Sequence, residues 1–92
     1  MTKYKLSPEA KDDLIRIYNY GLIQFGEAQA EKYIVELLDA FKRLTENPEH
    51  FPSVEEIAPG YRRCVHKSDS IYFKVIANTV EVMAIVGRQD FG

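Results

Sequence analysis

Apolar residues recur three or four positions apart through the first half of the chain. This spacing places them on one face of a helix and predicts two amphipathic helices, over residues 8–25 and about 27–46. The first stripe comprises Ala10, Leu14, Ile17, Tyr18, Gly21 and Phe25. The second comprises Ala30, Ile34, Leu37, Phe41 and Leu44, with Tyr33 and Leu38 widening it.

The predicted helices have recognisable ends. Ser7 is a suitable N-cap and Pro8 suits the first helical position, where no backbone N–H is needed. Gly26 can adopt the left-handed conformation that closes a helix, and the Asn47-Pro48 pair stops the second helix. Because the link at Gly26 is so short, residues 8–46 are expected to form an antiparallel helical hairpin.

The last third of the chain changes to β patterning. Strands are predicted over 61–65, 70–76 and 80–86, with turns at 67–69 and 77–79. The strand over 80–86 is apolar on both faces, which favours a central position. A short strand over 4–6 must join the same sheet. The expected fold is therefore one domain over 1–92, of the α+β class and β-α-α-β-β-β order, with the helical hairpin packed on a small antiparallel-rich sheet.

The segment between the second helix and the β region, residues 47–60, carries three prolines and no periodicity. It is long for a loop in a small domain, which is compatible with a functional loop. A packed connector is favoured, with Phe51 and Ile57 expected to pin it to the core.

Charge is unevenly distributed along the chain. Residues 1–56 hold 7 Lys/Arg and 11 Asp/Glu, a balance of −4, whereas residues 57–92 hold 5 and 3, a balance of +2. This weak basic excess does not predict a dedicated nucleic-acid binder, so no sequence-specific binding by the chain alone is expected. The single cysteine, Cys64, excludes an internal disulfide. With no signal peptide or membrane span visible, we expect a soluble cytoplasmic protein and no membrane partner.

The sequence offers little conventional chemistry. His50, His66 and Cys64 do not form a metal-ligand cluster, and no phosphate-binding glycine loop is present, so neither a metal nor a cofactor is expected. Cys64 and His66 share a strand face but have no evident orienting group. Asp12 and Asp13 diverge on the helix, so they are expected to lie on a solvated face.

Cationic side chains gather around the first two strands of the β region. Arg62 and His66 are expected on one strand face, Arg63 on the other, Lys67 in the turn and Arg88 after the last strand. Three explanations remain open. The cluster supports metal-free RNA cleavage with His66 as acid or base, it docks on an acidic partner, or it keeps a sheet edge soluble.

Several segments together resemble the ParE toxins of the RelE/ParE superfamily of type II toxin–antitoxin modules. They are LSPEAKDDL at the first helix, FG between helices, NP after the second, GYRR entering a strand and VGRQD after the last strand. The resemblance implies a toxin that poisons DNA gyrase and is neutralised by a ParD-like antitoxin in a hetero-oligomer. The RelE branch instead implies ribosome-dependent mRNA cleavage by strand lysines, arginines and a C-terminal tyrosine.

This chain departs from the RelE pattern. Ser70 and Cys64 stand where that branch has an arginine and a lysine, Arg62 replaces another lysine, and no tail tyrosine follows Gly92. No catalytic residues are therefore expected, and the alternatives are a RelE-like endonuclease or a non-toxic binding partner. The expected target-binding residues are Arg62, Arg63, His66, Lys67, Arg88, Gln89 and Asp90. The expected antitoxin-binding residues are Ile15, Leu22 and Ile23.

Overall fold

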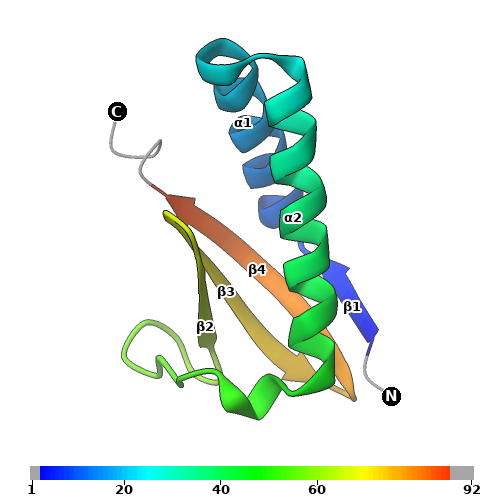
Figure 1. Cartoon of the computed structure of the whole chain (residues 1–92). Coiled ribbons are helices and arrows are strands. Elements are labelled where there is room, and N and C mark those ends of the chain that lie inside the picture. The colour runs from blue at the N-terminus through cyan, green and yellow to red at the C-terminus, as the bar shows by residue number, and fades with distance from the viewer. Residues whose placement is uncertain (1–2, 88–92) are drawn as a thin grey trace.

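Two helices and four strands form the described part of the chain, residues 3–87 of a computed structural model (Figure 1). The strands are β1 (Lys3–Leu6), β2 (Arg62–His66), β3 (Asp69–Ile76) and β4 (Thr79–Gly87). The helices are α1 (Pro8–Phe25) and α2 (Glu27–Glu46), followed by a 3-10 turn, η1 (Pro48–His50). The predicted α+β class and element order are confirmed, with strand ends shifted by one residue.

The sheet has the order β1-β4-β3-β2, and β4 is an inner strand, as its two apolar faces predicted. β3 is antiparallel to both β2 and β4, whereas β1 is parallel to β4. The parallel pair follows from the helical hairpin, which supplies the long connection that a parallel crossover needs. Both helices lie against one face of this mixed sheet (Figure 1).

Local signals in the sequence set the ends of the hairpin. The Ser7 hydroxyl accepts a hydrogen bond from the Ala10 N–H at 3.0 Å, and Pro8 occupies the first turn of α1. Gly26, with φ of 90°, donates its N–H to the Leu22 carbonyl at 3.1 Å and ends the helix. This one-residue link turns α2 back along α1 (Figure 1).

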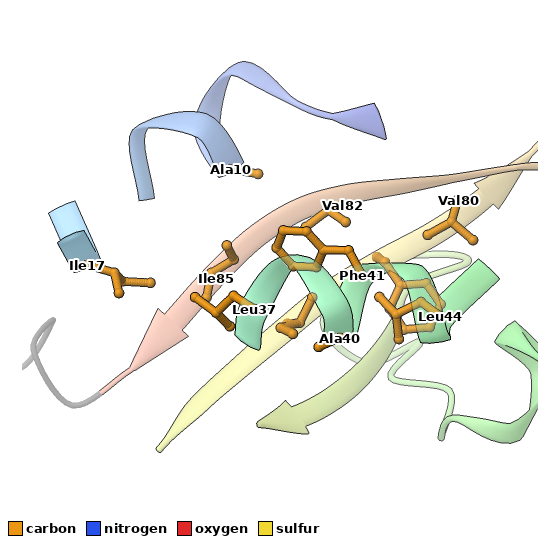
Figure 2. Packing of buried hydrophobic residues seen from close by; sticks show 11 residues of the cluster. Ala10, Ile17, Leu37, Ala40, Phe41, Leu44, Val80, Val82 and Ile85 are labelled. Carbon is orange, nitrogen blue, oxygen red and sulfur yellow. The ribbon is translucent and has the colours of Figure 1, made fainter. Parts of the chain in front are cut away.

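The core lies between the helical hairpin and the sheet (Figure 2). Phe41, Leu37 and Leu44 of α2 are fully buried against the inner face of β3 and β4. α1 contributes less, through Ala10 and Ile17. The prediction that Phe25 faces the core is wrong, because 67% of it is exposed at the hairpin tip, which extends beyond the sheet (Figure 1).

A β-bulge interrupts the alternation of β4. Phe73 pairs with Val82 but Tyr72 pairs with Ala84, so Met83 is the extra residue. The inward-facing set is consequently Val80 and Val82 before the bulge and Ile85 after it. Because the inward-facing positions change at the bulge, the apolar residues of β4 do not follow a single alternation, and its sequence looks apolar on both faces.

Side chains at the start of α1 form hydrogen bonds with backbone N–H and carbonyl groups of β4, beyond the point where β1 ends. The Ser7 hydroxyl donates to the Met83 carbonyl at 2.9 Å, and the Asp13 Oδ2 atom accepts the Ile85 N–H at 2.8 Å. Arg16 donates to the Ile85 carbonyl at 3.1 Å and to the Asp13 Oδ1 atom at 2.8 Å. The expectation that Asp13 lies on a solvated face is therefore wrong, since its carboxylate pairs with a strand and a neighbouring cation.

The segment between α2 and β2 is a packed connector, as favoured, and one of its two expected anchors, Phe51, is confirmed. The Phe51 ring packs edge-on against Phe73, with centroids 5.8 Å apart. Val54 is buried and its N–H donates to the Tyr61 carbonyl at 2.8 Å. The prediction for Ile57, the other expected anchor, is wrong: Ile57 is 53% exposed and lies in a turn closed by the hydrogen bond from its N–H to the Val54 carbonyl.

Candidate functional site

The basic residues of β2 do not converge in one place. Arg62 begins the strand and His66 ends it, so they lie about 13 Å apart at 3.3 Å per residue. The Arg62 guanidinium donates to the Phe51 carbonyl at 2.7 Å, which ties the connector to the sheet. Arg62 thus has a structural role at the far end of the strand from Lys67.

Arg63 lies on the opposite face of β2 from Arg62, as strand alternation predicted. It alternates with Cys64, which packs against the core, and shares the outer face with exposed Val65. On the same side of the sheet, Lys74 lies with its Nζ atom 5.8 Å from the centroid of the Tyr61 ring. The outer face therefore carries cationic and aromatic groups together.

His66 and Lys67, at the other end of β2, meet two side chains of α2. The Lys67 ammonium donates to the Glu36 Oε1 atom at 2.7 Å, and the His66 Nε2 atom is 3.9 Å from the same oxygen. The hydrogen bond from Lys67 holds the pKa of the Glu36 carboxyl below its usual range. The Tyr33 ring lies 5.7 Å from the His66 ring and 5.5 Å from the Lys67 Nζ atom.

Beneath this group, the Tyr33 hydroxyl donates a hydrogen bond to the carboxylate of Asp69. Asp69 opens β3 and is only 2% exposed. Burial and the Asp69 carboxylate raise the pKa of Tyr33 well above its ordinary value, so the phenol stays protonated. This pair could not be recognised from the sequence, because Asp69 resembled an ordinary turn residue and Tyr33 an ordinary member of the apolar stripe.

Cys64 and His66 do not form an activated pair. The Cys64 thiol is half-buried against the core, and this burial raises its pKa, which disfavours the thiolate. The Nε2 atom of His66 is itself buried. Among residues 3–87, no three His, Cys, Asp or Glu side chains are grouped to hold a metal ion.

A cavity of about 300 Å³ opens between the hairpin and the β2–β3 turn. It lies beside the tip-side halves of α1 and α2, and Tyr33 and Asp69 are part of its wall. Its remaining lining residues are Ile17, Tyr20, Gly21, Phe25, Gln29, Ala30, Lys67 and Ser68. Apart from Lys67, none of these belonged to the predicted site.

The tail residues predicted to bind the target, Arg88, Gln89 and Asp90, lie outside the described residues. Gly87, the last residue of β4, pairs with Asp69. β4 therefore ends at the same end of the sheet as His66 and Lys67.

The residues predicted to bind an antitoxin lie on α1. Ile15 is 60% and Ile23 is 81% exposed, whereas Leu22 is partly buried. Large apolar side chains missed by the sequence reasoning add to the exposed surface of the hairpin: Tyr20, Phe25 and Val35. In the region that the structure describes, no helix is long and apolar enough to span a membrane.

Comparisons with known proteins identify the family. Residues 4–90 match the family described as the ParE toxin of the type II toxin–antitoxin system parDE. The chain is 33% identical over 89 residues to the toxin ParE1 of Mycobacterium tuberculosis, covering 96% of this chain and 91% of the relative. It is 35% identical over 75 residues to the toxin ParE1 of Caulobacter vibrioides, covering 82% and 78%.

A solved structure shares the fold. The chromosomal ParDE toxin–antitoxin system from P. aeruginosa contains a chain that superposes with a TM-score of 0.83 at 21% identity. The match covers 95% of this chain and 96% of the other. The family match over residues 4–90 and the relatives that align over nearly the whole length show that this chain belongs to the ParE toxin family of type II toxin–antitoxin systems.

Proposed function

We propose that this chain inhibits or poisons DNA gyrase by binding to it, and that a ParD-like antitoxin neutralises it. Membership of the ParE family supports this target. The single observation that favours binding over catalysis is the burial of His66, the strongest acid–base candidate. Its Nε2 atom is buried, and its ring packs against Tyr33.

General acid–base chemistry needs a titrating atom within hydrogen-bond reach of the substrate proton. The Nε2 atom of His66 does not offer that reach unless α2 moves away. Cys64, the other reactive side chain on this face, is disfavoured as a thiolate by burial. Neither group is arranged to cleave RNA, so the RelE-like endonuclease is the weaker alternative.

The proposed docking surface is the end of the sheet where β2 turns into β3. The Lys67 side chain is 59% exposed there, although it also pairs with Glu36. Arg88 follows Gly87, which pairs with Asp69 at the same end, and Gln89 and Asp90 continue from it. Arg63 extends the cationic surface on the outer face. Charge-assisted hydrogen bonds from these groups suit an acidic protein surface.

The test is a supercoiling assay with purified gyrase and the Lys67→Ala and Arg88→Ala variants. Losing one charge-assisted hydrogen bond costs about 1–3 kcal/mol, so each variant is expected to need roughly 5- to 150-fold more protein for equal inhibition. Lys42→Ala is the matched control, because Lys42 is an exposed lysine of α2 outside the site. Its potency should equal that of the parent protein.

A parallel assay of ribosome-dependent mRNA cleavage distinguishes the alternatives. A binding mechanism predicts no cleavage and little effect of His66→Ala on gyrase inhibition. Cleavage that falls by about 10²–10⁴-fold in His66→Ala would instead establish acid–base catalysis. A protein inactive in both assays, yet able to bind an antitoxin, would be a non-toxic partner with the same fold.

A further inference from the structure

Positive charge gathers on the outer face of the sheet, which is the face turned away from the two helices (Figure 1). Within residues 3–87, strand alternation places four cations on this face: Lys3 and Lys5 of β1, Arg63 of β2 and Lys74 of β3. The same alternation places one carboxylate there, that of Glu81 on β4. The strands of this face therefore carry a charge balance of +3, although the whole chain has a net charge of −2.

Neighbouring carboxylates do not neutralise these cations. In the described part of the chain, no ion pair joins any of the four to an acidic side chain, and the Arg63 Nε atom has no hydrogen-bond partner. The Lys74 ammonium instead lies near the Tyr61 ring, and a cation beside an aromatic ring stays charged and keeps its hydrogen-bond donors. The face is consequently open to an anionic partner, which would receive charge-assisted hydrogen bonds from these groups.

Two tyrosines alternate with two of the cations. Arg63 of β2 lies directly opposite Tyr72 of β3, and Lys74 follows Tyr72 by two positions on the same face. Tyr61 immediately precedes β2, and its ring centroid is 5.8 Å from the Lys74 Nζ atom. Opposed side chains in such a pair have Cβ atoms about 5 Å apart. Tyr61, Arg63, Tyr72 and Lys74 therefore form one compact group, the Tyr–cation patch, in which rings and charges are neighbours.

The two rings of the Tyr–cation patch border a hollow. It has a volume of about 660 Å³ and is lined by Tyr61 and Tyr72 together with residues of β4, the connector and the start of α1. The other lining residues are mostly apolar: Ile57, Met83, Ala84 and Val86, with Ser7, Pro8 and Glu9 at the α1 end. The tyrosine rings thus border open space in which a planar group can pack against them.

We propose that the outer face of the sheet binds a single strand of nucleic acid without sequence preference. Bases stack on Tyr61 and Tyr72, and phosphates contact Arg63, Lys74 and Lys5. Each nucleotide of a strand carries one charge and one planar group, and this repeat matches a surface on which cations and rings are neighbours. In a duplex the base faces are stacked on one another and cannot reach the rings. Base faces and phosphates are common to DNA and RNA, so the site accepts a single strand of either.

This inference goes beyond the proposed function and does not rest on it. The Tyr–cation patch shares only Arg63 with the surface proposed to dock on gyrase, and strand binding is measured without gyrase. A chain that binds a strand but fails to inhibit gyrase would refute the proposed function alone. Gyrase inhibition by a chain that binds no strand would refute this inference alone.

The test is fluorescence anisotropy of a labelled oligothymidylate of about 12 nucleotides, a length that suits one small binding domain. The full-length chain is expected to bind with a dissociation constant between about 10⁻⁶ and 10⁻⁴ M, the usual range of non-specific binding. Tyr72→Leu keeps an apolar side chain but removes the ring, and it should weaken binding by about 5- to 150-fold, the effect of losing one stacked base. Tyr72→Phe keeps the ring and should bind as the parent protein does. Circular dichroism verifies the fold of each variant.

The dependence on salt separates the rings from the charges. Each phosphate contact contributes about 0.7 to the slope of log affinity against log salt concentration for a single strand. Lys74→Gln should therefore reduce this slope by about 0.7, whereas Tyr72→Leu should weaken binding and leave the slope unchanged.

Two variants on the helical hairpin are the matched controls. Tyr20→Leu removes a tyrosine that is 44% exposed on α1, and Lys42→Gln removes an exposed lysine of α2. Both should leave the affinity and the salt slope unchanged. Oligouridylate of equal length should bind within about threefold of oligothymidylate, because the rings and cations contact only base faces and phosphates.

Four results would overturn the inference. They are the absence of binding up to a chain concentration of about 10⁻⁴ M, equal affinity for a duplex of the same length, losses in the control variants that match those in Tyr72→Leu and Lys74→Gln, and binding of oligouridylate alone. Competition by polyglutamate as strong as that by unlabelled oligothymidylate would also overturn it, and would assign the face to an acidic protein instead.

Discussion

Asp13 shows how one side chain can join two elements. Its Oδ2 atom accepts the Ile85 N–H of β4, while its Oδ1 atom accepts from Arg16 on the next turn of α1. Asp13→Ala would leave the Ile85 N–H unpaired at the edge of the sheet and is expected to lower the free energy of unfolding by about 1–3 kcal/mol. Urea denaturation measures this change.

Asp12→Ala is the control for that prediction, because Asp12 is the adjacent carboxylate and is exposed. It should change the free energy of unfolding by less than about 0.5 kcal/mol. Equal effects of the two substitutions would mean that the link to Ile85 contributes nothing measurable.

Cys64 is a second residue whose reactivity follows from its surroundings. Burial raises its pKa, so a smaller fraction is thiolate at pH 8 than in the unfolded chain, and the sulfur is also less accessible. We expect a disulfide reagent to modify native Cys64 several-fold more slowly than the denatured protein at pH 8. Faster reaction in the native state would indicate an activated thiol and revive nucleophilic chemistry with His66.

At the scale of elements, the connector between α2 and β2 depends on Val54. Val54 is 3% exposed and Ile57 is 53% exposed, although both are β-branched residues of one loop. Val54→Ala is expected to cost on the order of 1–3 kcal/mol in unfolding free energy, whereas Ile57→Ala should cost less than about 0.5 kcal/mol. Thermal or urea denaturation of the pair checks this, and a larger loss from Ile57→Ala would contradict the observed packing.

The elements themselves were largely predictable because their signals are local. Ser7-Pro8 and Gly26 act within a few residues of the chain, and Asn78 has the positive φ of 61° that a tight turn requires. These residues determine helix ends and turns through interactions within a few positions of the chain. The two apolar stripes then fix which helix faces meet the sheet.

Features that depend on distant partners were not predictable in the same way. The hydrogen bond between Asp13 and the Ile85 N–H lies just beyond the bulge at Met83. The bulge changes which residues of β4 face the helices, and it cannot be recognised in a strand sequence that is apolar throughout. Tyr33 and Asp69 are 36 positions apart, and only the fold brings them together beneath His66. The sequence therefore predicted which charged residues lie on β2, but not that Arg62 and His66 are separated at opposite ends of the strand.

At the scale of the whole molecule, residues 3–87 expose large apolar side chains on both the helical hairpin and the sheet. Those on the hairpin include Ile15, Ile23 and Phe25, and those on the sheet include Val65 on its outer face. The sheet face also carries Arg63 and Lys74, whereas acidic residues predominate in the first half of the chain. An amphipathic helix from an antitoxin requires apolar anchors at helical spacing, and Ile15 and Ile23, eight positions apart on α1, meet that requirement.

Ile23→Asp is accordingly expected to weaken the antitoxin complex by at least about tenfold, which corresponds to roughly 1.4 kcal/mol. The reason is that a carboxylate would be placed against the apolar face of the partner helix without a counter-ion. Val65→Asp is the matched control, since Val65 is 65% exposed and lies on the sheet. Titration calorimetry with the purified ParD-like antitoxin measures both affinities.

A loss confined to Val65→Asp would assign the antitoxin to the outer face of the sheet and contradict the hairpin assignment. Affinity unchanged in Ile15→Asp, Leu22→Asp and Ile23→Asp together would remove the hairpin from the interface altogether.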